Sequence, residues 1–388
     1  MDAGEVVRVN PRLLDEVRRY GRFDTSCFNC GTCTLSCDLS DASASFPRRT
    51  IQYAMLGITD RLHAGLEPWL CQDCGDCSTR CPREADPRDS MATLRRYLAA
   101  RYDWTGLAAR ISRSKAAGIG ALLSAGLLVL GMAVAYHLFS AGMPLSELAV
   151  TPMGMEHMFP AITWFTLAVI VFPWIILLSH AVRMHRFTMR QGAGAKIPLS
   201  LYFSELKTLM VYAITQRRLG ECPDKTHKVR WIKHLVLASG GMLMFVLLVF
   251  FLRFFQADAI HPVYHPQRWL GYIATAFLVY GSADILIGRL KKKKELYGHS
   301  EWSDYSLPLL ILLTAVSGIA VHLARYLGFP LVSHYAYLLH LMIAVPTLVV
   351  EVPFGKWSHI FHRPLAIYLQ SVREKAAAPE IGEKLEAA

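Results

Sequence analysis

Eight of the nine cysteines in this chain fall into two copies of one spacing pattern, C-x2-C-x2-C-x3-C. The short gaps allow one loop to present three thiolates to one small inorganic cluster. Gly31 and Gly75, one in each run, let the backbone pass close to such a cluster. The pattern therefore predicts two [4Fe–4S] clusters in the N-terminal part of the chain. The first run comprises Cys27, Cys30, Cys33 and Cys37, and the second comprises Cys71, Cys74, Cys77 and Cys81.

The fourth cysteine of each run decides how the two runs share their ligands. In two-cluster ferredoxins with this spacing, the fourth cysteine ligates the cluster of the other run. Pro82 follows the second run, as this pattern requires, whereas Asp38 stands at the same position after the first run. The expected ligand sets are Cys27, Cys30, Cys33 and Cys81 for one cluster, and Cys71, Cys74, Cys77 and Cys37 for the other.

Zinc sites and disulfides are the competing interpretations of these cysteines. A zinc site needs four ligands but no second two-residue gap within one run, and disulfides need an oxidising compartment. Residues 1–26 carry many charges and lack the apolar core of a signal peptide. We therefore expect clusters in a head that stays in the cytoplasm. Cys222, alone in the segment GECPD, is expected to be a free thiol.

Six apolar stretches are long enough, or nearly so, to cross a bilayer, which takes about 20 residues. Basic residues gather in the loops after the second and fourth stretches, and the loop after the first has none. This alternation predicts an inner-membrane protein with both termini in the cytoplasm. The net charge of +11 then reflects membrane topology, and we expect no nucleic-acid partner. The stretches lie at approximately 115–140, 160–183, 231–255, 268–288, 305–327 and 334–354.

Histidines in and beside these stretches are candidate haem ligands, because ionisable groups are costly in a membrane and usually mark function. Haem b held by two imidazoles needs both at the same depth. His234 and His359 match in depth on the inner side, and His322 and His340 match on the outer side. The same side chains also suit a carbonyl hydrogen bond, a quinone pocket or a proton relay. The competing ligands are His180, His185, His362 and His137.

Two carboxylates in the apolar stretches, Glu351 and Asp284, are candidates to transfer protons to or from a quinone. Both lie toward the inner end, where an acid can also simply reach the interface. Arg325 and Tyr326 follow His322 and are candidates to line an outer quinone pocket. The sequence has no GxGxxG fingerprint, P-loop or adjacent cysteine pair, which favours an electron-transfer subunit over a complete enzyme.

The two parts of the chain resemble two known modules. The cysteine-rich head resembles the C subunit of heterodisulfide reductases. The last four apolar stretches resemble the cytochrome b subunit of those reductases and the gamma subunit of respiratory nitrate reductase. The resemblance assigns haem ligation to three histidines: His359 in VPFGKWSH, His340 in LLHL and His234 in RWIKH. The family has a second histidine on the helix of His234, and this chain has Met244 at that position. The resemblance therefore implies an inner haem and leaves three alternatives on the outer side: ligation by His322, ligation by Met244, or no outer haem.

The order of the two modules resembles the family of C subunits of quinone-interacting membrane-bound oxidoreductase complexes. That resemblance implies cytoplasmic flavin/iron–sulfur partner subunits, menaquinone as substrate, and a link to adenylylsulfate reductase in dissimilatory sulfate metabolism. Electrons would pass between the quinone pool, haem b, the two clusters and these partners. The alternatives are a haem-free anchor with direct quinone-to-cluster transfer, a subunit serving heterodisulfide or sulfite reductase, and an ion-translocating module.

The expected fold is mainly α-helical, with a helical ferredoxin-like head that holds two [4Fe–4S] clusters, followed by a six-helix transmembrane cytochrome b bundle. Residues 199–216 alternate at roughly helical period and are expected to form an interfacial helix or a docking face. The expected domains are the head with its linker at 1–113, two spans and a basic loop at 114–228, a four-helix haem domain at 229–370 and a solvated tail at 371–388.

Overall fold

The computed structural model describes residues 7–40, 45–141, 144–151, 159–190, 197–221, 225–252, 259–292, 297 and 300–386. Cys222 lies outside these residues. The described chain is helical and contains no strand, with a single isolated bridge between Val9 and Ile58. This confirms the predicted fold class. The chain divides into two compact units, which we call the cysteine unit (1–113, 177–231 and 357–388) and the bundle unit (114–176 and 232–356).

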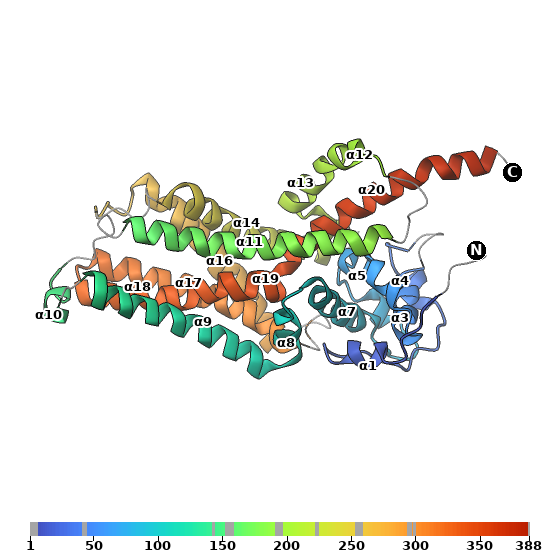
Figure 1. Cartoon of the computed structure of the whole chain (residues 1–388), viewed down its shortest axis with the longest axis horizontal. Helices are drawn as coiled ribbons and strands as arrows, with labels where there is room; N and C mark the ends of the chain where they lie inside the picture. Colours follow the sequence, from blue (N-terminus) through green and yellow to red (C-terminus); the bar gives the residue numbers. More distant parts are fainter. Residues whose placement is uncertain are drawn as a thin grey trace. The chain divides into compact units, whose positions relative to one another are not determined.

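The cysteine unit begins with eight short or medium helices, labelled in Figure 1 where there is room. Its centre is α7, which has Pro87 at its first position, where a missing N–H costs nothing. Met91, Leu94, Leu98 and Tyr102 follow at helical spacing and are fully buried. The helices are α1 (Leu13–Arg18), α2 (Thr32–Leu35), α3 (Arg48–Met55), α4 (Thr59–Ala64), α5 (Glu67–Leu70), α6 (Asp76–Thr79), α7 (Pro87–Tyr102) and α8 (Leu107–Arg113).

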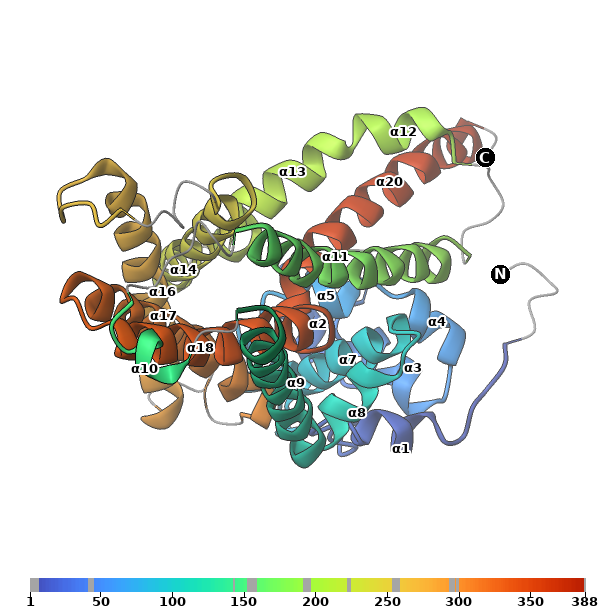
Figure 2. The same ribbon diagram turned by 60° about the vertical axis from the view of Figure 1, so that its left-hand side comes forward.

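The later part of the cysteine unit adds the end of α11 (Phe159–Arg190), α12 (Leu199–Ser204), α13 (Leu206–Thr215) and α20 (His359–Glu386). Figure 2 shows α12 and α13 running beside α20. The predicted single helix at 199–216 is thus two helices that meet at Glu205. The Glu205 carboxylate accepts hydrogen bonds from Ser371 at 2.6 Å and from Lys375, which ties this junction to α20.

The bundle unit consists of long helices that expose apolar side chains. They are α9 (Lys115–Tyr136), the first part of α11, α14 (Lys225–Phe250), α16 (Pro266–Leu290), α17 (Trp302–Tyr326) and α18 (Pro330–Pro346), with the short α10 (Leu145–Leu148). A π-helix (Thr347–Glu351) and α19 (Val352–Phe354) complete the last span, and a 3₁₀ turn (Lys356–Ser358) follows it.

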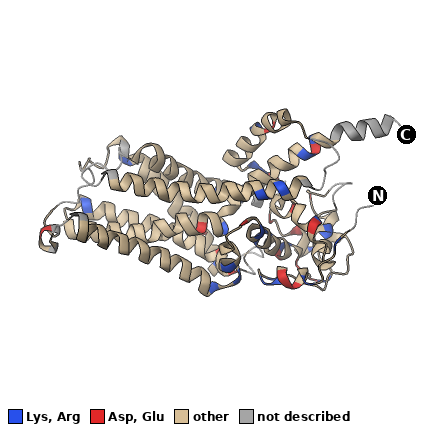
Figure 3. Ribbon diagram, in the orientation of Figure 1, with Lys and Arg blue, Asp and Glu red and all other residues tan. Residues whose placement is uncertain are grey.

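Six helices are long and apolar enough to cross a membrane, as the sequence predicted. Figure 3 shows how sparse charged residues are along them. At most 33% of each span's apolar window is buried inside the protein, so the remaining apolar surface needs a non-aqueous solvent. The spans are Lys115–Phe139, Ala161–Met189, Lys228–Phe250, Arg268–Leu290, Trp302–Tyr326 and Pro330–Phe354.

Small residues allow the bundle helices to approach closely. A β-carbon added at Gly126 of α9 would lie 3.0 Å from the Met342 carbonyl oxygen of α18. A β-carbon added at Gly240 of α14 would lie 3.0 Å from the Ala274 carbonyl oxygen of α16. Such contacts are typical of membrane helices, where close backbone packing replaces a hydrophobic driving force.

Stability of the cysteine unit should fall in mild acid because of His63. This imidazole is 6% exposed, and its Nε2 lies 2.9 Å from the Tyr97 hydroxyl. Burial, helped by Arg101, lowers the pKa of His63 from 6.5 to about 4. Between these two pH values the unfolded chain binds a proton that the native chain does not, so the native state loses stability as the pH falls.

We expect the unfolding free energy to drop by up to about 3 kcal/mol from pH 6.5 to pH 4 through this group. Denaturant unfolding of the intact chain across this pH range measures the effect. The His63→Phe variant should show a flatter pH dependence than the parent chain. An equal pH dependence in both proteins would contradict the assignment.

Candidate iron–sulfur and electron-transfer site

The two cysteine runs adopt the same backbone conformation. Asn29 (φ 66°) and Gly31 (φ 88°) in the first run correspond to Asp73 (φ 59°) and Gly75 (φ 98°) in the second. Each glycine caps a four-residue helix, α2 or α6, and these two helices contact each other. A left-handed glycine at this point turns the chain back around the space that the first three cysteines surround. The duplication seen in the spacing is therefore also a structural duplication.

Most of the thiols that influence one another belong to the same crosswise ligand set, and Cys33 also acts on Cys77 of the other set. Burial raises the pKa of Cys33, and the nearby thiols of Cys27, Cys30 and Cys81 raise it further. Burial, with contributions from Cys71 and Cys74, raises the pKa of Cys37 to about 12. Such desolvated thiols favour the neutral form unless a cation is bound, and iron would supply the compensating positive charge.

The spacing of these thiols differs from that of a site for one metal ion. In the part of the chain that the structure describes, no three histidine, cysteine, aspartate or glutamate side chains converge so as to hold a single ion. Zinc would draw its thiolates to about 2.3 Å from one centre. A four-iron cluster distributes its four ligands over four irons, so it does not need its ligands to converge on one centre.

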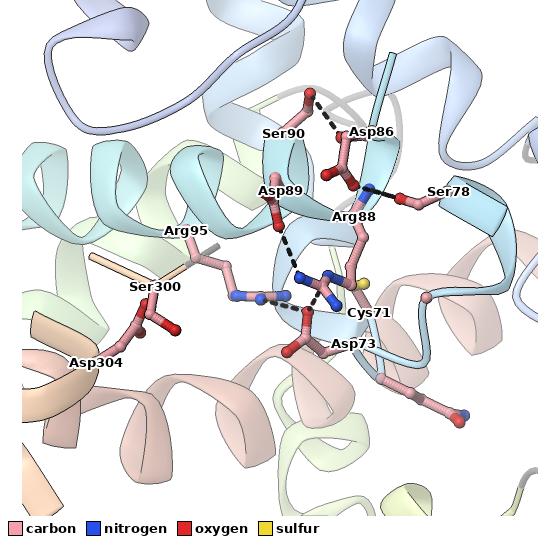
Figure 4. A network of polar contacts seen from close by, with 12 residues as sticks. Cys71, Asp73, Ser78, Asp86, Arg88, Asp89, Ser90, Arg95, Ser300 and Asp304 are labelled. Carbon is pink, nitrogen blue, oxygen red and sulfur yellow. Dashed lines mark hydrogen bonds and ion pairs between the residues drawn. The ribbon is translucent and has the colours of Figure 1, made fainter. Parts of the chain in front are cut away.

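An ion-pair network borders the second cysteine run (Figure 4). The Arg88 guanidinium lies 2.9 Å from an Asp89 oxygen and 3.8 Å from an Asp73 oxygen. Arg95 lies 3.5 Å from the same Asp73 oxygen. Ser78, in α6, donates a hydrogen bond to Asp86 just before α7. These contacts fix the second run against α7.

Two further arginines hold the same run by its backbone. Arg230 donates to the carbonyl oxygens of Asp73 at 2.9 Å and of Gln72 at 2.5 Å. Arg363 donates to the carbonyl oxygen of Trp69 at 3.1 Å and to that of Cys71. Burial and the nearby Arg95 lower the pKa of Arg363 to about 10, which leaves the guanidinium charged at neutral pH. Our sequence reasoning missed both arginines, although each adjoins a motif residue, Trp231 or His362.

A second feature of the cysteine unit is a pair of buried histidines, His180 and His362. Both are at most 1% exposed, and their ring centroids lie 5.6 Å apart with an interplanar angle of 16°. Their four ring nitrogens have no hydrogen-bond partner among the described residues. Burial, followed by His180 and His359, holds the pKa of His362 well below its usual range. The sequence identified both only as competing haem ligands.

Asp103 and two aromatic rings surround this histidine pair. An Asp103 oxygen lies 3.7 Å from His180 Nε2. Burial would raise the pKa of Asp103, but the nearby His180 ring and hydrogen bonds from Thr105 and Ala108 more than offset this and lower it to about 2. The rings of Trp69 and Tyr102 lie 4.8 and 5.5 Å from that of His362.

Among the predicted haem ligands, His340 has the arrangement expected of a ligand. Its Nδ1 lies 3.0 Å from Ser317 Oγ, and that hydroxyl donates to the Thr314 carbonyl. Ser317 therefore accepts from Nδ1–H, which leaves Nε2 as the basic nitrogen. Gly318 leaves space beside the ring, since a β-carbon there would lie 3.4 Å from His340 Cε1.

The other predicted ligands have different surroundings. His322 Nε2 lies 3.1 Å from the Arg268 guanidinium and 3.0 Å from the Tyr272 hydroxyl. His234 and Met244 lie in α14 of the bundle unit, whereas His359 begins α20 in the cysteine unit. The pairing of these groups around haem stays a prediction.

The two predicted proton carriers are both engaged in polar contacts. Glu351 is 5% exposed, accepts a hydrogen bond from Ser306 and accepts another from the Lys356 backbone N–H at 3.1 Å. Asp284 forms an ion pair with Lys233 at 2.5 Å. Glu351 is thus held in the protein interior, and the charge of Asp284 is paired with that of Lys233 on α14.

Comparison with known proteins agrees with the head of the chain. Residues 25–85 match the family described as 4Fe-4S dicluster domain. The C2 subunit of the H(2)/formate:CoB-CoM heterodisulfide,ferredoxin reductase of Methanococcus maripaludis is 38% identical over 74 residues, which is 19% of this chain and 40% of that protein. The second iron-sulfur C subunit of the CoB--CoM heterodisulfide reductase of Methanocaldococcus jannaschii is 33% identical over 100 residues, 24% of this chain and 53% of that protein.

A third relative, the C subunit of the ferredoxin:CoB-CoM heterodisulfide reductase of Methanosarcina mazei, is 36% identical over 88 residues, 23% of this chain and 54% of that protein. The chain thus spans about half the length, or less, of these curated relatives. No solved structure matches. The cysteine-bearing segment therefore matches a 4Fe-4S dicluster domain and is similar to part of the C subunit of heterodisulfide reductases, in one chain with six candidate membrane spans.

Proposed function

We propose that this chain is the membrane subunit of an oxidoreductase complex that carries electrons between the menaquinone pool and cytoplasmic flavin/iron–sulfur subunits. The observation that carries the proposal is the presence of a dicluster domain and six candidate membrane spans in one polypeptide. A dicluster domain accepts and passes single electrons, and spans of this kind give access to a lipid-soluble donor.

Haem b is the proposed carrier between quinone and clusters, and when bound it supplies a further one-electron centre. Within the bundle unit, His340 would hold it through Nε2, while Ser317 fixes the ring orientation through Nδ1. By the family resemblance, His359 and His234 would hold a haem at the inner side. On the outer side three alternatives remain: ligation by His322, ligation by Met244, or no outer haem. Ligation by His322 would exclude this histidine from a quinone site.

The polar cluster around His322 is the proposed quinone site. Arg268 and Tyr272 each lie within hydrogen-bond distance of His322, and the Arg268 guanidinium lies 5.5 Å from the centre of the Tyr326 ring. These groups offer donors to the carbonyl oxygens of a quinone and acceptors for quinol protons. Ser306, which contacts Glu351, lies about 24 Å farther along α17, because each residue adds about 1.5 Å. The two regions therefore belong to opposite ends of the bundle unit.

Two matched variants decide which end reacts with quinone. Reaction at the His322 cluster predicts that Tyr272→Phe raises the KM for quinol about five- to tenfold, the effect of one lost hydrogen bond to the ligand. Glu351→Gln and Asp284→Asn should then leave quinol kinetics unchanged. Reaction at the other end predicts the reverse. Glu351→Gln should then slow turnover, and Tyr272→Phe should leave the KM for quinol unchanged. Quinol-dependent dye reduction by the purified chain, with haem content as a control, measures both.

The proposed soluble partners are flavin/iron–sulfur subunits of the same complex and, through them, adenylylsulfate reductase of dissimilatory sulfate metabolism. These partners come from the family resemblance. The similarity of the head to the C subunit of heterodisulfide reductases favours a second candidate, a subunit that serves heterodisulfide or sulfite chemistry. Affinity purification of the intact complex from its native membrane, followed by identification of the co-purified subunits, separates the two candidates.

Cofactor content of the detergent-purified chain tests the proposal as a whole. Two haems b with about eight non-haem irons per chain would support the complete electron path. One haem b with the same iron would restrict the path to a single haem. Iron without haem would overturn the cytochrome part and leave direct quinone-to-cluster transfer.

A further inference from the structure

We propose that Arg230 and Arg363 are positioning residues that raise the reduction potential of the cluster held by the second cysteine run, so that this cluster is reduced before the other. The inference rests on the electron-transfer function proposed above. The reduction potentials of the clusters are equilibrium properties that can be measured without quinone or haem. The inference can therefore fail while the proposed function holds, and the reverse.

The two arginines act on the second run from distant parts of the sequence. Arg230 belongs to α14 and donates to the Gln72 and Asp73 carbonyls, on the residues that follow Cys71. Arg363 belongs to α20 and donates to the Trp69 and Cys71 carbonyls. Together they bind the backbone on both sides of the first cysteine of this run.

Arg230 and Arg363 differ from the neighbouring arginines in that the described structure gives them no carboxylate as an ion-pair partner. Arg88 and Arg95 both pair with the Asp73 carboxylate, and Arg88 also pairs with Asp89. Among the described residues, the hydrogen-bond partners of Arg230 and Arg363 are uncharged carbonyl oxygens. Two guanidinium charges therefore act on the cluster position without a carboxylate bound directly to either.

Burial increases the effect of these charges. Cys71, Gln72 and Cys77 are at most 9% exposed, so water screens little of the field. One-electron reduction adds one negative charge to a cluster that its four thiolates already make anionic. Burial alone would disfavour that charge and lower the potential, and nearby positive charge opposes this by stabilising the reduced state.

The first run has a weaker counterpart. A β-carbon at Gly31 would lie 3.3 Å from an Arg48 guanidinium nitrogen, so Arg48 is beside this run. Cys33 is as buried as Cys77, but Cys30 and Phe28 are exposed, so water reaches this run and screens its one guanidinium more than it screens the two at the second run. The structural duplication of the two runs is thus accompanied by an asymmetric charge environment, which gives the two clusters different potentials.

Redox titration of the intact chain, monitored by electron paramagnetic resonance with mediators and dithionite as reductant, tests the inference. The cluster of the second run is identified as the signal that disappears in Cys74→Ser. We expect Arg230→Gln and Arg363→Gln each to shift the midpoint potential of that signal downward, and the double variant to shift it further. The signal of the first run should keep its potential, and Arg48→Gln should move only that signal.

Charge-conserving variants distinguish charge from structure. Arg363→Lys and Arg230→Lys should retain most of the wild-type potential. Unchanged potentials in both glutamine variants, or equal shifts of both clusters, would overturn the inference. If the glutamine variants assemble no second cluster, titration of the wild-type protein alone still tests the inference. The signal that is missing from Cys74→Ser should have the higher midpoint potential of the two wild-type signals. A lower potential for that signal contradicts the proposal.

Discussion

The Cys37→Ser variant is expected to lose the cluster of the second cysteine run and to retain the cluster of its own run. Cys37 follows Cys33 closely in sequence, yet the thiols that raise its pKa are those of Cys71 and Cys74. Cys81 likewise acts on Cys33 of the first run. We therefore expect each fourth cysteine to serve the opposite run, so that its loss removes about half of the non-haem iron.

Four single variants make this test unambiguous. Cys37→Ser should lack the same electron paramagnetic resonance signal as Cys74→Ser, and Cys81→Ser should lack the same signal as Cys30→Ser. Iron analysis of each purified variant gives the stoichiometry. Loss of the same signal in Cys37→Ser and Cys30→Ser would mean that each run serves a single cluster, which contradicts the crosswise arrangement.

The His340→Ala variant is expected to lose a haem b while its iron–sulfur content stays unchanged. The reason is the tautomer fixed by Ser317, which leaves His340 Nε2 free to coordinate. Ser317→Ala removes this support and should weaken haem binding by about 10- to 100-fold, as is typical when the hydrogen bond behind a ligand is lost. Pyridine haemochromogen analysis of the purified variants measures both effects.

His334 offers a matched control, because it lies on the same helix and its Nε2 lies 3.4 Å from the Thr151 carbonyl. His334→Ala should leave haem content unchanged. His359→Ala, at the site implied by the family resemblance, should also lose a haem. Full haem content in both His340→Ala and His359→Ala would remove the haem assignment.

Features encoded locally in the sequence were predictable. The cysteine spacing specified two equivalent loops, because three thiolates within one short loop and a left-handed glycine are local requirements. The six candidate spans follow from uninterrupted apolar length. The domain boundaries expected after residues 113, 228 and 370 and the cytoplasmic position of both termini remain predictions.

Features that depend on long-range contacts were not predictable. Arg363 contacts the Cys71 carbonyl across 292 positions of sequence, and Arg230 contacts the Asp73 carbonyl across 157. A basic residue near a predicted helix end resembles an ordinary solvated charge, and only the fold shows that it binds a cluster loop. The buried pairing of His180 with His362 depends on the same kind of information.

We propose that electrons pass between quinol and the two clusters within this one chain. The most direct measurement adds a menaquinol analogue to the oxidised, purified chain in nanodiscs, then follows haem absorbance and the cluster signals. We expect reduction of haem b followed by reduction of the cluster of the second run, with both responses lost in the His340→Ala/His359→Ala double variant. The opposite result is that quinol leaves the clusters of the intact, haem-loaded chain oxidised although dithionite reduces them. That result would contradict electron transfer from quinol to the clusters.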